Sequence, residues 1–98
     1  MTKVAKRSEI PPGTGKVVEA GGKTLALFNC EGVFYAVDNT CVHRGGPLGE
    51  GSLSGTTVTC PWHGWGYDVA TGACQTNPAA KVQRFDVTVE GDDLLVSL

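Results

Sequence analysis

The sequence lacks any long apolar run. Stretches such as Leu25 to Phe28 are far shorter than the roughly 20 apolar residues that a membrane-spanning helix needs. No apolar signal core follows the polar start from Met1 to Arg7. These features argue against a membrane protein and predict a soluble chain in the cytoplasm.

Charge is also scarce. The 98 residues carry a formal net charge of −2, and only 18% of them are charged. Binding to nucleic acid depends on clustered positive charge, so the composition gives no reason to expect a nucleic-acid partner. The length predicts a single domain that spans residues 1–98.

Helical periodicity is missing, and strand patterns take its place. Lys16 to Ala20 and Lys23 to Cys30 flank Gly21-Gly22 and predict a β-hairpin. Further strands are expected at residues 2–6, 33–37, 56–59 and 67–69, and in a hairpin around Gly91 near the C-terminus. We therefore predict an all-β fold.

Only two histidines occur, and each is paired with a cysteine. The pairs are Cys41-Val-His43 and Cys60-Pro-Trp-His63, each short enough to bind one metal centre from one loop. Zinc accepts two thiolates and two imidazoles, whereas a [2Fe–2S] centre of the Rieske type takes two cysteines on one iron and two histidines on the other. Cys41, His43, Cys60 and His63 are thus predicted metal ligands, and their spacing alone leaves both metals open.

The residues around the ligands favour iron and sulfur. The first loop reads Cys41-Val-His-Arg-Gly-Gly-Pro-Leu48, and the second reads Cys60-Pro-Trp-His-Gly-Trp-Gly-Tyr-Asp68, with Thr71-Gly72 after it. These C-x-H-R-G and C-P-x-H-G-W motifs closely resemble those of the Rieske iron–sulfur domain. The resemblance is strong over residues 39–79. It implies a base of antiparallel strands in an incomplete barrel, with a small β subdomain at approximately 39–79 that holds one [2Fe–2S] cluster at its tip.

The same resemblance suggests roles for individual residues. Cys41 and Cys60 would bind one iron as thiolates, and His43 and His63 would bind the other as neutral imidazoles. Four glycines would let the loops approach the sulfurs and donate N–H groups to them, although ordinary turn chemistry could explain the last two: Gly45, Gly46, Gly49 and Gly51. Pro78 is either part of a third loop that covers the cluster or an ordinary loop proline.

Differences from high-potential members of this family predict a low reduction potential. Those members carry a disulfide between the two loops, where this chain has Gly46 and Trp62, and a serine that bonds a bridging sulfide, where it has Trp65. Tyr67 matches the tyrosine that bonds a cysteine sulfur. Fewer hydrogen bonds to sulfur leave the reduced cluster less stabilised.

The chain offers no second cofactor site. Both histidines are already used, and no dinucleotide-binding motif is present. The resemblance therefore implies a stand-alone ferredoxin that carries one electron from a flavoprotein reductase to a terminal oxygenase, as in aromatic-ring dioxygenase systems. It would not itself be an enzyme, and it would be a monomer when isolated. One alternative is the small subunit of an NAD(P)H nitrite reductase, bound to a large subunit. Another is a structural zinc module.

Other residues receive simpler interpretations. Cys30 is expected to be small and buried, no role is assigned to Cys74, and a bridge between them is not favoured. Trp62 and Trp65 are expected to pack rather than to carry electrons. Residues 39–79 contain few formal charges, namely Arg44, Glu50 and Asp68. A docking face centred on Val42, His43, Pro61 and His63 would therefore be nearly uncharged.

Overall fold

The computed structural model describes residues 2–39, 47–62, 64–76 and 80–97. These ranges contain short strands and two single-turn 3₁₀ helices. The strands are β1 (Thr2–Lys6), β2 (Gly15–Ala20), β3 (Lys23–Cys30), β4 (Val33–Asp38), β5 (Ser52–Ser54), β6 (Thr57–Thr59), β7 (Gly66–Asp68), β8 (Arg84–Phe85), β9 (Val87–Glu90) and β10 (Asp93–Val96), and the helices are η1 (Arg7–Glu9) and η2 (Leu48–Glu50). The all-β prediction is confirmed. Helices of three residues are far too short to cross a membrane.

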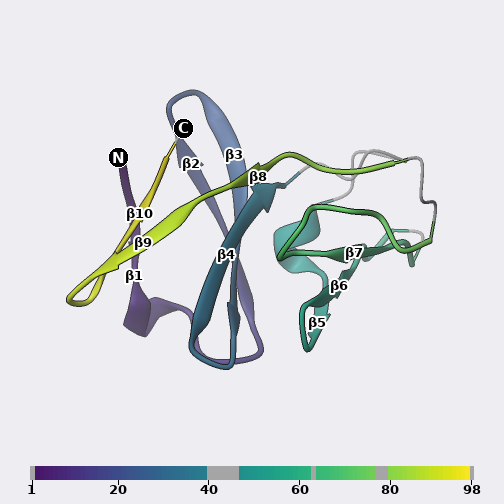
Figure 1. Ribbon diagram of the computed structural model, residues 1–98, viewed down its shortest axis with the longest axis horizontal. Helices are drawn as coiled ribbons and strands as arrows, with labels where there is room; N and C mark the ends of the chain where they lie inside the picture. The colour runs from purple at the N-terminus through teal and green to yellow at the C-terminus, as the bar shows by residue number, and fades with distance from the viewer. Residues whose placement is uncertain (1, 40–46, 63, 77–79, 98) are drawn as a thin grey trace.

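The strands form three antiparallel sheets (Figure 1). β1, β10 and β9 make one sheet, and β2, β3, β4 and β8 make the second, which is central in the molecule. The third sheet, β5-β6-β7, lies beside the central sheet and away from both chain ends. This arrangement places β6 and β7, which flank the second cysteine–histidine motif, at one end of the molecule.

The β2–β3 hairpin illustrates how local sequence sets the base. Ala20 pairs with Lys23, so the turn consists of Gly21 and Gly22 alone. Their φ angles are 56° and 77°, and both central positions of a type I′ turn require such positive values. Glycine adopts them without a steric penalty. The predicted hairpin is confirmed.

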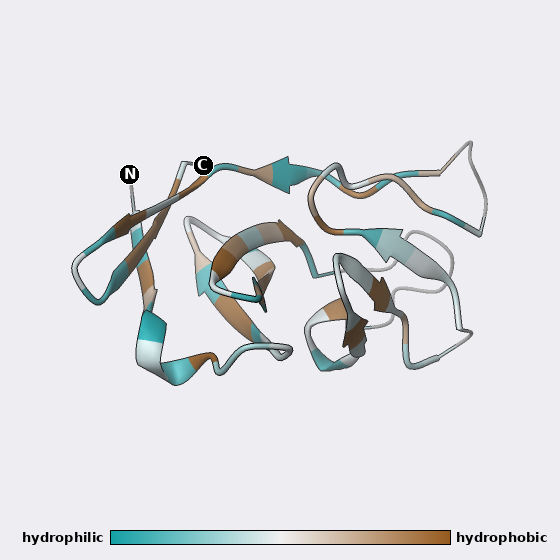
Figure 2. Ribbon diagram, turned by 60° about the horizontal axis from the view of Figure 1, so that its bottom comes forward, coloured by the Kyte–Doolittle hydropathy of each residue, from teal (hydrophilic) through white to brown (hydrophobic). Residues whose placement is uncertain are grey.

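The central sheet is buried on both faces. The four residues from Leu25 to Phe28 are all fully buried, and successive side chains in a strand point to opposite faces. One face contributes to a tip-side core of Ala26, Phe28, Cys30, Val37, Leu48, Val58, Cys60, Tyr67, Val69, Cys74 and Val82. The other contributes to a base-side core of Ala5, Ile10, Val18, Ala20, Leu25, Leu27, Phe34, Ala36, Phe85, Leu94 and Val96. Hydrophobic segments accordingly lie on both sides of this sheet (Figure 2).

The tip-side core joins the central sheet to the third sheet. Leu48 comes from η2, Val58 from β6 and Tyr67 from β7, and each is fully buried in the core that also contains residues of β3 and β4. Burying one such side chain contributes about 1.5–3 kcal/mol. The small sheet therefore gains its hydrophobic contacts from the base.

Candidate metal centre

Cys60 is the predicted ligand that the described structure places. It follows directly after β6, which lies between β5 and β7, and its exposed fraction is 1%. Its N–H donates to the carbonyl of Trp65 at 2.7 Å, and its own carbonyl accepts from the N–H of Gly64 at 3.0 Å. These two bonds close the base of the second motif loop and hold the Cys60 backbone in a fixed position.

The other predicted ligands, Cys41, His43 and His63, lie outside the described residues, as do Val42, Arg44, Gly45, Gly46 and Pro78. The four ligands therefore stay a prediction as a set. Among the residues that are described, no three histidine, cysteine or acidic side chains come together to form a metal site. What the structure does define is the base of each loop that carries these residues.

The first motif loop leaves the base at Asn39 and returns at Leu48. The N–H of Leu48 donates to the main-chain carbonyl of Asn39 at 2.8 Å. The next N–H, from Gly49, donates to the side-chain Oδ1 of Asn39, also at 2.8 Å. Both ends of the segment that contains Cys41 and His43 are thereby tied together. No motif in the sequence pointed to Asn39.

The third loop is tied to the second. Gln75 donates its N–H to the carbonyl of Gly66 at 2.7 Å, and the N–H of Gly66 donates to Thr76 Oγ1 at 3.0 Å. An isolated bridge also pairs Tyr67 with Cys74. The segment that leads to Pro78 therefore starts beside the residue that follows Trp65.

These loop bases fit an iron–sulfur cluster. Leu48, Cys60, Tyr67 and Cys74 come from the three loop stems and share the tip-side core, so the stems meet at one end of the molecule. Cys60 is shielded from water in apolar surroundings, and such shielding protects a metal–thiolate bond and tunes its redox potential. A thiol at this position is a soft donor suited to iron–sulfur clusters and to zinc.

Gly49 and Gly51 are required for close packing. A Cβ at Gly49 would lie 2.5 Å from Val17 Cγ2, and one at Gly51 would lie 2.2 Å from the carbonyl oxygen of Thr59. Their N–H groups bond Asn39 Oδ1 and the Leu48 carbonyl. The prediction that these two N–H groups bond sulfur is therefore wrong. The turn alternative is supported, because Gly49 lies in the single turn of η2 and Gly51 closes that turn.

The two tryptophans differ. Trp65 is partly buried and packs against the tip-side core, as predicted. Trp62 is 58% exposed, so the expectation that it packs is wrong. The Cys60–Trp65 loop places it beyond the apolar core. Tyr67, in contrast, is fully buried in the same core as Cys60.

Cys30 is buried, as predicted, and its thiol is free, so it forms no bridge with Cys74. Burial raises the pKa of the Cys30 thiol, and the negative charges of Asp68 and Glu31 raise it further. A thiol with a raised pKa is a poor nucleophile and a poor metal ligand at neutral pH. Cys30 therefore does not compete with Cys60 for metal.

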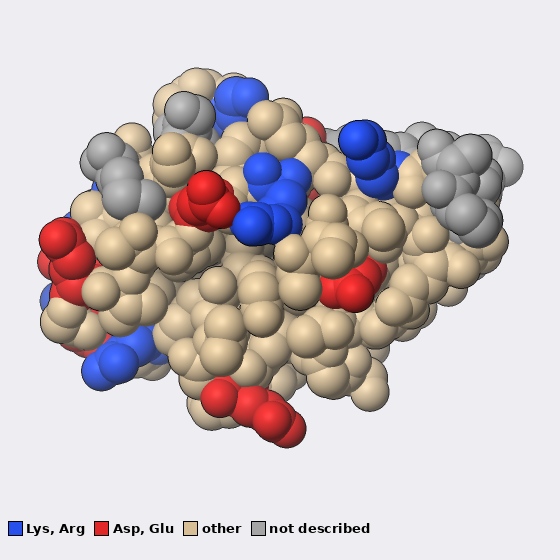
Figure 3. All heavy atoms as spheres, viewed as in Figure 1, with Lys and Arg blue, Asp and Glu red and all other residues tan. Residues whose placement is uncertain are grey.

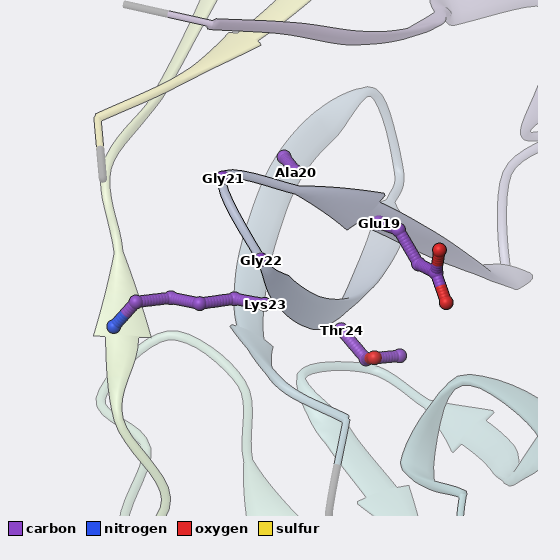
Figure 4. A pocket seen from close by; sticks show the side chains of 6 residues that line it. All are labelled: Glu19, Ala20, Gly21, Gly22, Lys23 and Thr24. Carbon is purple, nitrogen blue, oxygen red and sulfur yellow. The ribbon is translucent and has the colours of Figure 1, made fainter.

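Two surface hollows offer no competing site. One, of about 280 Å³, lies at the β2–β3 turn, where Lys23 points away from Glu19 and Thr24 (Figure 4). The ammonium group of Lys23 lies 5.4 Å from the centre of the Phe85 ring instead. The second, of about 550 Å³, lies between Gly13–Gly15 and Gly49–Leu53, with Glu50 as its charged side chain. Within the described part of the chain, neither hollow is lined by a histidine or a cysteine, so neither offers the ligands that the two motifs supply.

Comparison with protein families gives a match over nearly the whole chain. The model of the Rieske [2Fe-2S] domain matches residues 1–91. The ferredoxin component of a naphthalene 1,2-dioxygenase system from Pseudomonas aeruginosa is 36% identical over 91 residues, which cover 92% of this chain and 88% of that protein.

Comparison with solved structures agrees. A chain in a complex of reduced oxygenase and oxidised ferredoxin in carbazole 1,9a-dioxygenase superposes with a TM-score of 0.88 at 34% identity, covering 97% of this chain and 99% of that one. A protein described as the small subunit of an NADPH nitrite reductase superposes with a TM-score of 0.86 at 20% identity, over 99% and 97% of the two chains. At that identity the second likeness shows the fold alone.

Proposed function

Because this chain belongs to the Rieske [2Fe-2S] domain family, we propose that it is the ferredoxin component of a multicomponent dioxygenase system. It accepts one electron at a time and delivers it to a terminal oxygenase. The observation that carries this proposal is the near full-length match to a dioxygenase ferredoxin, at 36% identity. The nitrite reductase alternative lacks comparable support, because that likeness extends only to the fold.

The proposed ligands are Cys41 and Cys60 for one iron, and His43 and His63 for the other, with residues 39–79 as the cluster-binding subdomain. A bound Rieske cluster supplies a site that stores and releases one electron. Cys60 binds as a thiolate, and the hydrogen bonds at its loop base hold its backbone in place. Tyr67, buried beside it in the tip-side core, donates its hydroxyl to a cysteine sulfur and so stabilises the reduced state.

The proposed partners are a flavoprotein reductase, which supplies the electron, and a terminal oxygenase, which receives it. The carbazole 1,9a-dioxygenase relative was captured together with its oxygenase, which supports the second partner. We propose that the isolated chain is a monomer and acts in the cytoplasm. The free thiol of Cys30 is consistent with a reducing compartment.

Two measurements test this function. A reductive titration of the purified protein should consume one electron per chain. In stopped flow, the reduced protein should then be reoxidised by the terminal oxygenase encoded nearest to its gene. Uptake of no electron, or of two, would contradict the proposal, and so would a failure to reduce the oxygenase at any ratio of the two proteins.

A pair of buried cysteines provides a matched control. Cys60→Ser should abolish electron uptake, because it removes a thiolate ligand. Cys30→Ala should leave uptake unchanged, although Cys30 is also buried in the tip-side core. Equal electron uptake by the two variants would show that Cys60 is not a ligand.

A further inference from the structure

Two asparagines are the buried polar side chains of the described chain, Asn29 at 5% exposure and Asn39 at 8%. Asn29 serves the base: its Nδ2 donates to the Ile10 carbonyl at 2.8 Å, and its Oδ1 accepts from the Gly32 N–H at 2.7 Å. Asn39 instead lies directly after β4, at the start of the first motif loop. The two asparagine side chains thus form hydrogen bonds at opposite ends of the central sheet.

Asn39 links three parts of the chain. Its N–H donates to the Thr24 carbonyl of β3 at 3.1 Å, and its carbonyl accepts from the N–H of Leu48 at 2.8 Å. Its Oδ1 accepts from the N–H of Gly49, the next residue of η2. The start of the loop, the end of the loop and the central sheet are therefore connected through one residue.

The described residues of the other two motif loops are held by different hydrogen bonds. The second is closed by the main-chain bonds of Cys60 with Trp65 and Gly64. The third is held by the bond from Gln75 to the Gly66 carbonyl and by the exposed side chain of Thr76. Gly49 also packs closely against Val17 of β2, so this contact and the bond to Asn39 together place η2 against the central sheet.

From this geometry we propose that Asn39 is a positioning residue for the cluster. Its Oδ1 fixes the returning end of the first ligand loop at Gly49 and so constrains both ends of the segment that carries the proposed ligands Cys41 and His43. The inference rests on the proposed function, since it needs a cluster to position. Without this acceptor, the N–H of Gly49 is left buried and unsatisfied, and the loop end can move away from the sheet.

The test compares three variants with the wild type. Asn39→Leu keeps the approximate size of the side chain but removes the acceptor, and Asn39→Asp keeps an oxygen at the Oδ1 position. Asn29→Leu is the matched control, because it removes an equally buried amide on the same pair of strands at their far end. The readouts are the rate at which visible absorption is lost in the presence of an iron chelator, and the width of the EPR lines of the reduced protein. Each variant is measured at the same interval below its own Tm.

Asn39→Leu should lose its cluster about 10–100-fold faster than the wild type, as is typical when a residue that orients a ligand is removed, and its EPR lines should broaden. Asn29→Leu should stay within about twofold of the wild type, because a distant site acts independently. Asn39→Asp should resemble the wild type more than it resembles Asn39→Leu. If Asn39→Leu does not fold, Asn39→Ser, whose hydroxyl is too short to reach Gly49, takes its place.

The outcomes separate the two proposals. A wild-type protein that binds no iron–sulfur cluster overturns the proposed function, and the role of Asn39 falls with it. A wild type that holds its cluster, together with equal cluster loss in the Asn39→Leu and Asn29→Leu variants, overturns the role of Asn39 alone. A slow rate in Asn39→Asp together with a fast rate in Asn39→Leu would show that the acceptor oxygen is what matters.

Discussion

At the scale of single residues, Gly49 combines two constraints. Its N–H is used by Asn39, and its α-carbon faces Val17 so closely that a Cβ would lie 2.5 Å from Cγ2 and 3.2 Å from the Val17 nitrogen. Gly49→Ala should therefore lower the free energy of unfolding by about 1–3 kcal/mol, the usual cost of overpacking. Urea denaturation measures this change.

Gly66→Ala is the control for that substitution. A Cβ at Gly66 would meet Thr57 Cγ2 at 3.5 Å and Gln75 Oε1 at 3.8 Å, which are ordinary contacts. Its free energy of unfolding should change by no more than about 0.5 kcal/mol. Equal losses in the two variants would show that the close approach to Val17 is not the cause.

Tyr67 should tune the reduction potential. The wild-type midpoint is expected near roughly −150 mV, at the low end of the Rieske range, because Trp65 replaces a serine that would bond sulfide. Tyr67→Phe should move the midpoint to a more negative value by removing a donor to a thiolate. Tyr35→Phe alters a partly buried tyrosine of β4 that also packs against the tip-side core, and it should leave the midpoint unchanged. Protein-film voltammetry decides, and an unchanged midpoint in Tyr67→Phe would refute the assigned bond.

Several of these residues could be found from the sequence, and others could not. Cys60 and Tyr67 stand at fixed places in a motif, so pattern alone predicts their roles, and both are buried in the tip-side core. Asn39 lies just outside the motif and acts through Gly49, ten positions along the chain, and nothing local marks such a contact. The burial of Trp62 could not be predicted, because the position of its loop relative to the core depends on how the third sheet packs.

At the scale of secondary-structure elements, the sequence predicts the hairpins but not the shortest strand and the short helix η2. Gly21-Gly22 encodes its turn locally. β8, in contrast, is a two-residue strand that exists through the pairing of Ala36 with Phe85 and of Val37 with Arg84. η2 likewise depends on contacts with β2 and on the Asn39 bond. Elements that are stabilised mainly by distant partners leave little trace in their own sequence.

The short helix η1 is connected to β2 through Glu9. Its Oε1 accepts from the Lys6 N–H at 2.8 Å, and its Oε2 pairs with Lys16 Nζ at 2.8 Å. The hydrogen bond from Lys16, followed by that from the Lys6 backbone, lowers the pKa of Glu9. A carboxylate with a lowered folded-state pKa stabilises the protein above its unfolded pKa of about 4.3. That contribution is lost as the pH falls through the folded value.

Glu9→Gln should therefore be less stable than the wild type at neutral pH. The difference should shrink as the pH falls below about 4, where the wild type also loses its charge. Thermal unfolding across a pH series measures this, with the exposed Glu90→Gln on β9 as the control. A difference between Glu9→Gln and the wild type that does not change with pH would contradict the role of the ionised carboxylate.

At the scale of the whole molecule, charge is concentrated on the base. The ion pairs Lys3–Asp93, Lys16–Glu9 and Arg84–Asp86 all lie there. Within the described part of residues 47–76, Glu50 and Asp68 are the charged side chains. In Figure 3 the charged groups are accordingly spread over the base strands, with wide uncharged areas around the third sheet. The described surface around the third sheet is therefore largely neutral.

Electron transfer to the oxygenase should accordingly depend only mildly on salt, because screening acts mainly on charge–charge attraction. Trp62→Ala should slow the transfer at limiting oxygenase, since an exposed aromatic side chain is a typical docking anchor. Val33→Ala is the control, because Val33 has a similar exposed fraction of 53% but lies at the start of β4, at the end of the strand away from the first motif loop. This variant should transfer electrons at the wild-type rate. A steep fall in rate with salt would show that charged residues such as Lys81 and Arg84 control docking instead.

The central claim is that this chain holds a [2Fe–2S] cluster through Cys41, His43, Cys60 and His63. Iron, zinc and acid-labile sulfide should be measured in protein purified anaerobically after expression with sufficient iron. The cluster requires about two irons and two sulfides per chain, together with visible absorption. About one zinc per chain, with no sulfide and a colourless protein, would contradict the assignment and establish a structural zinc module in its place.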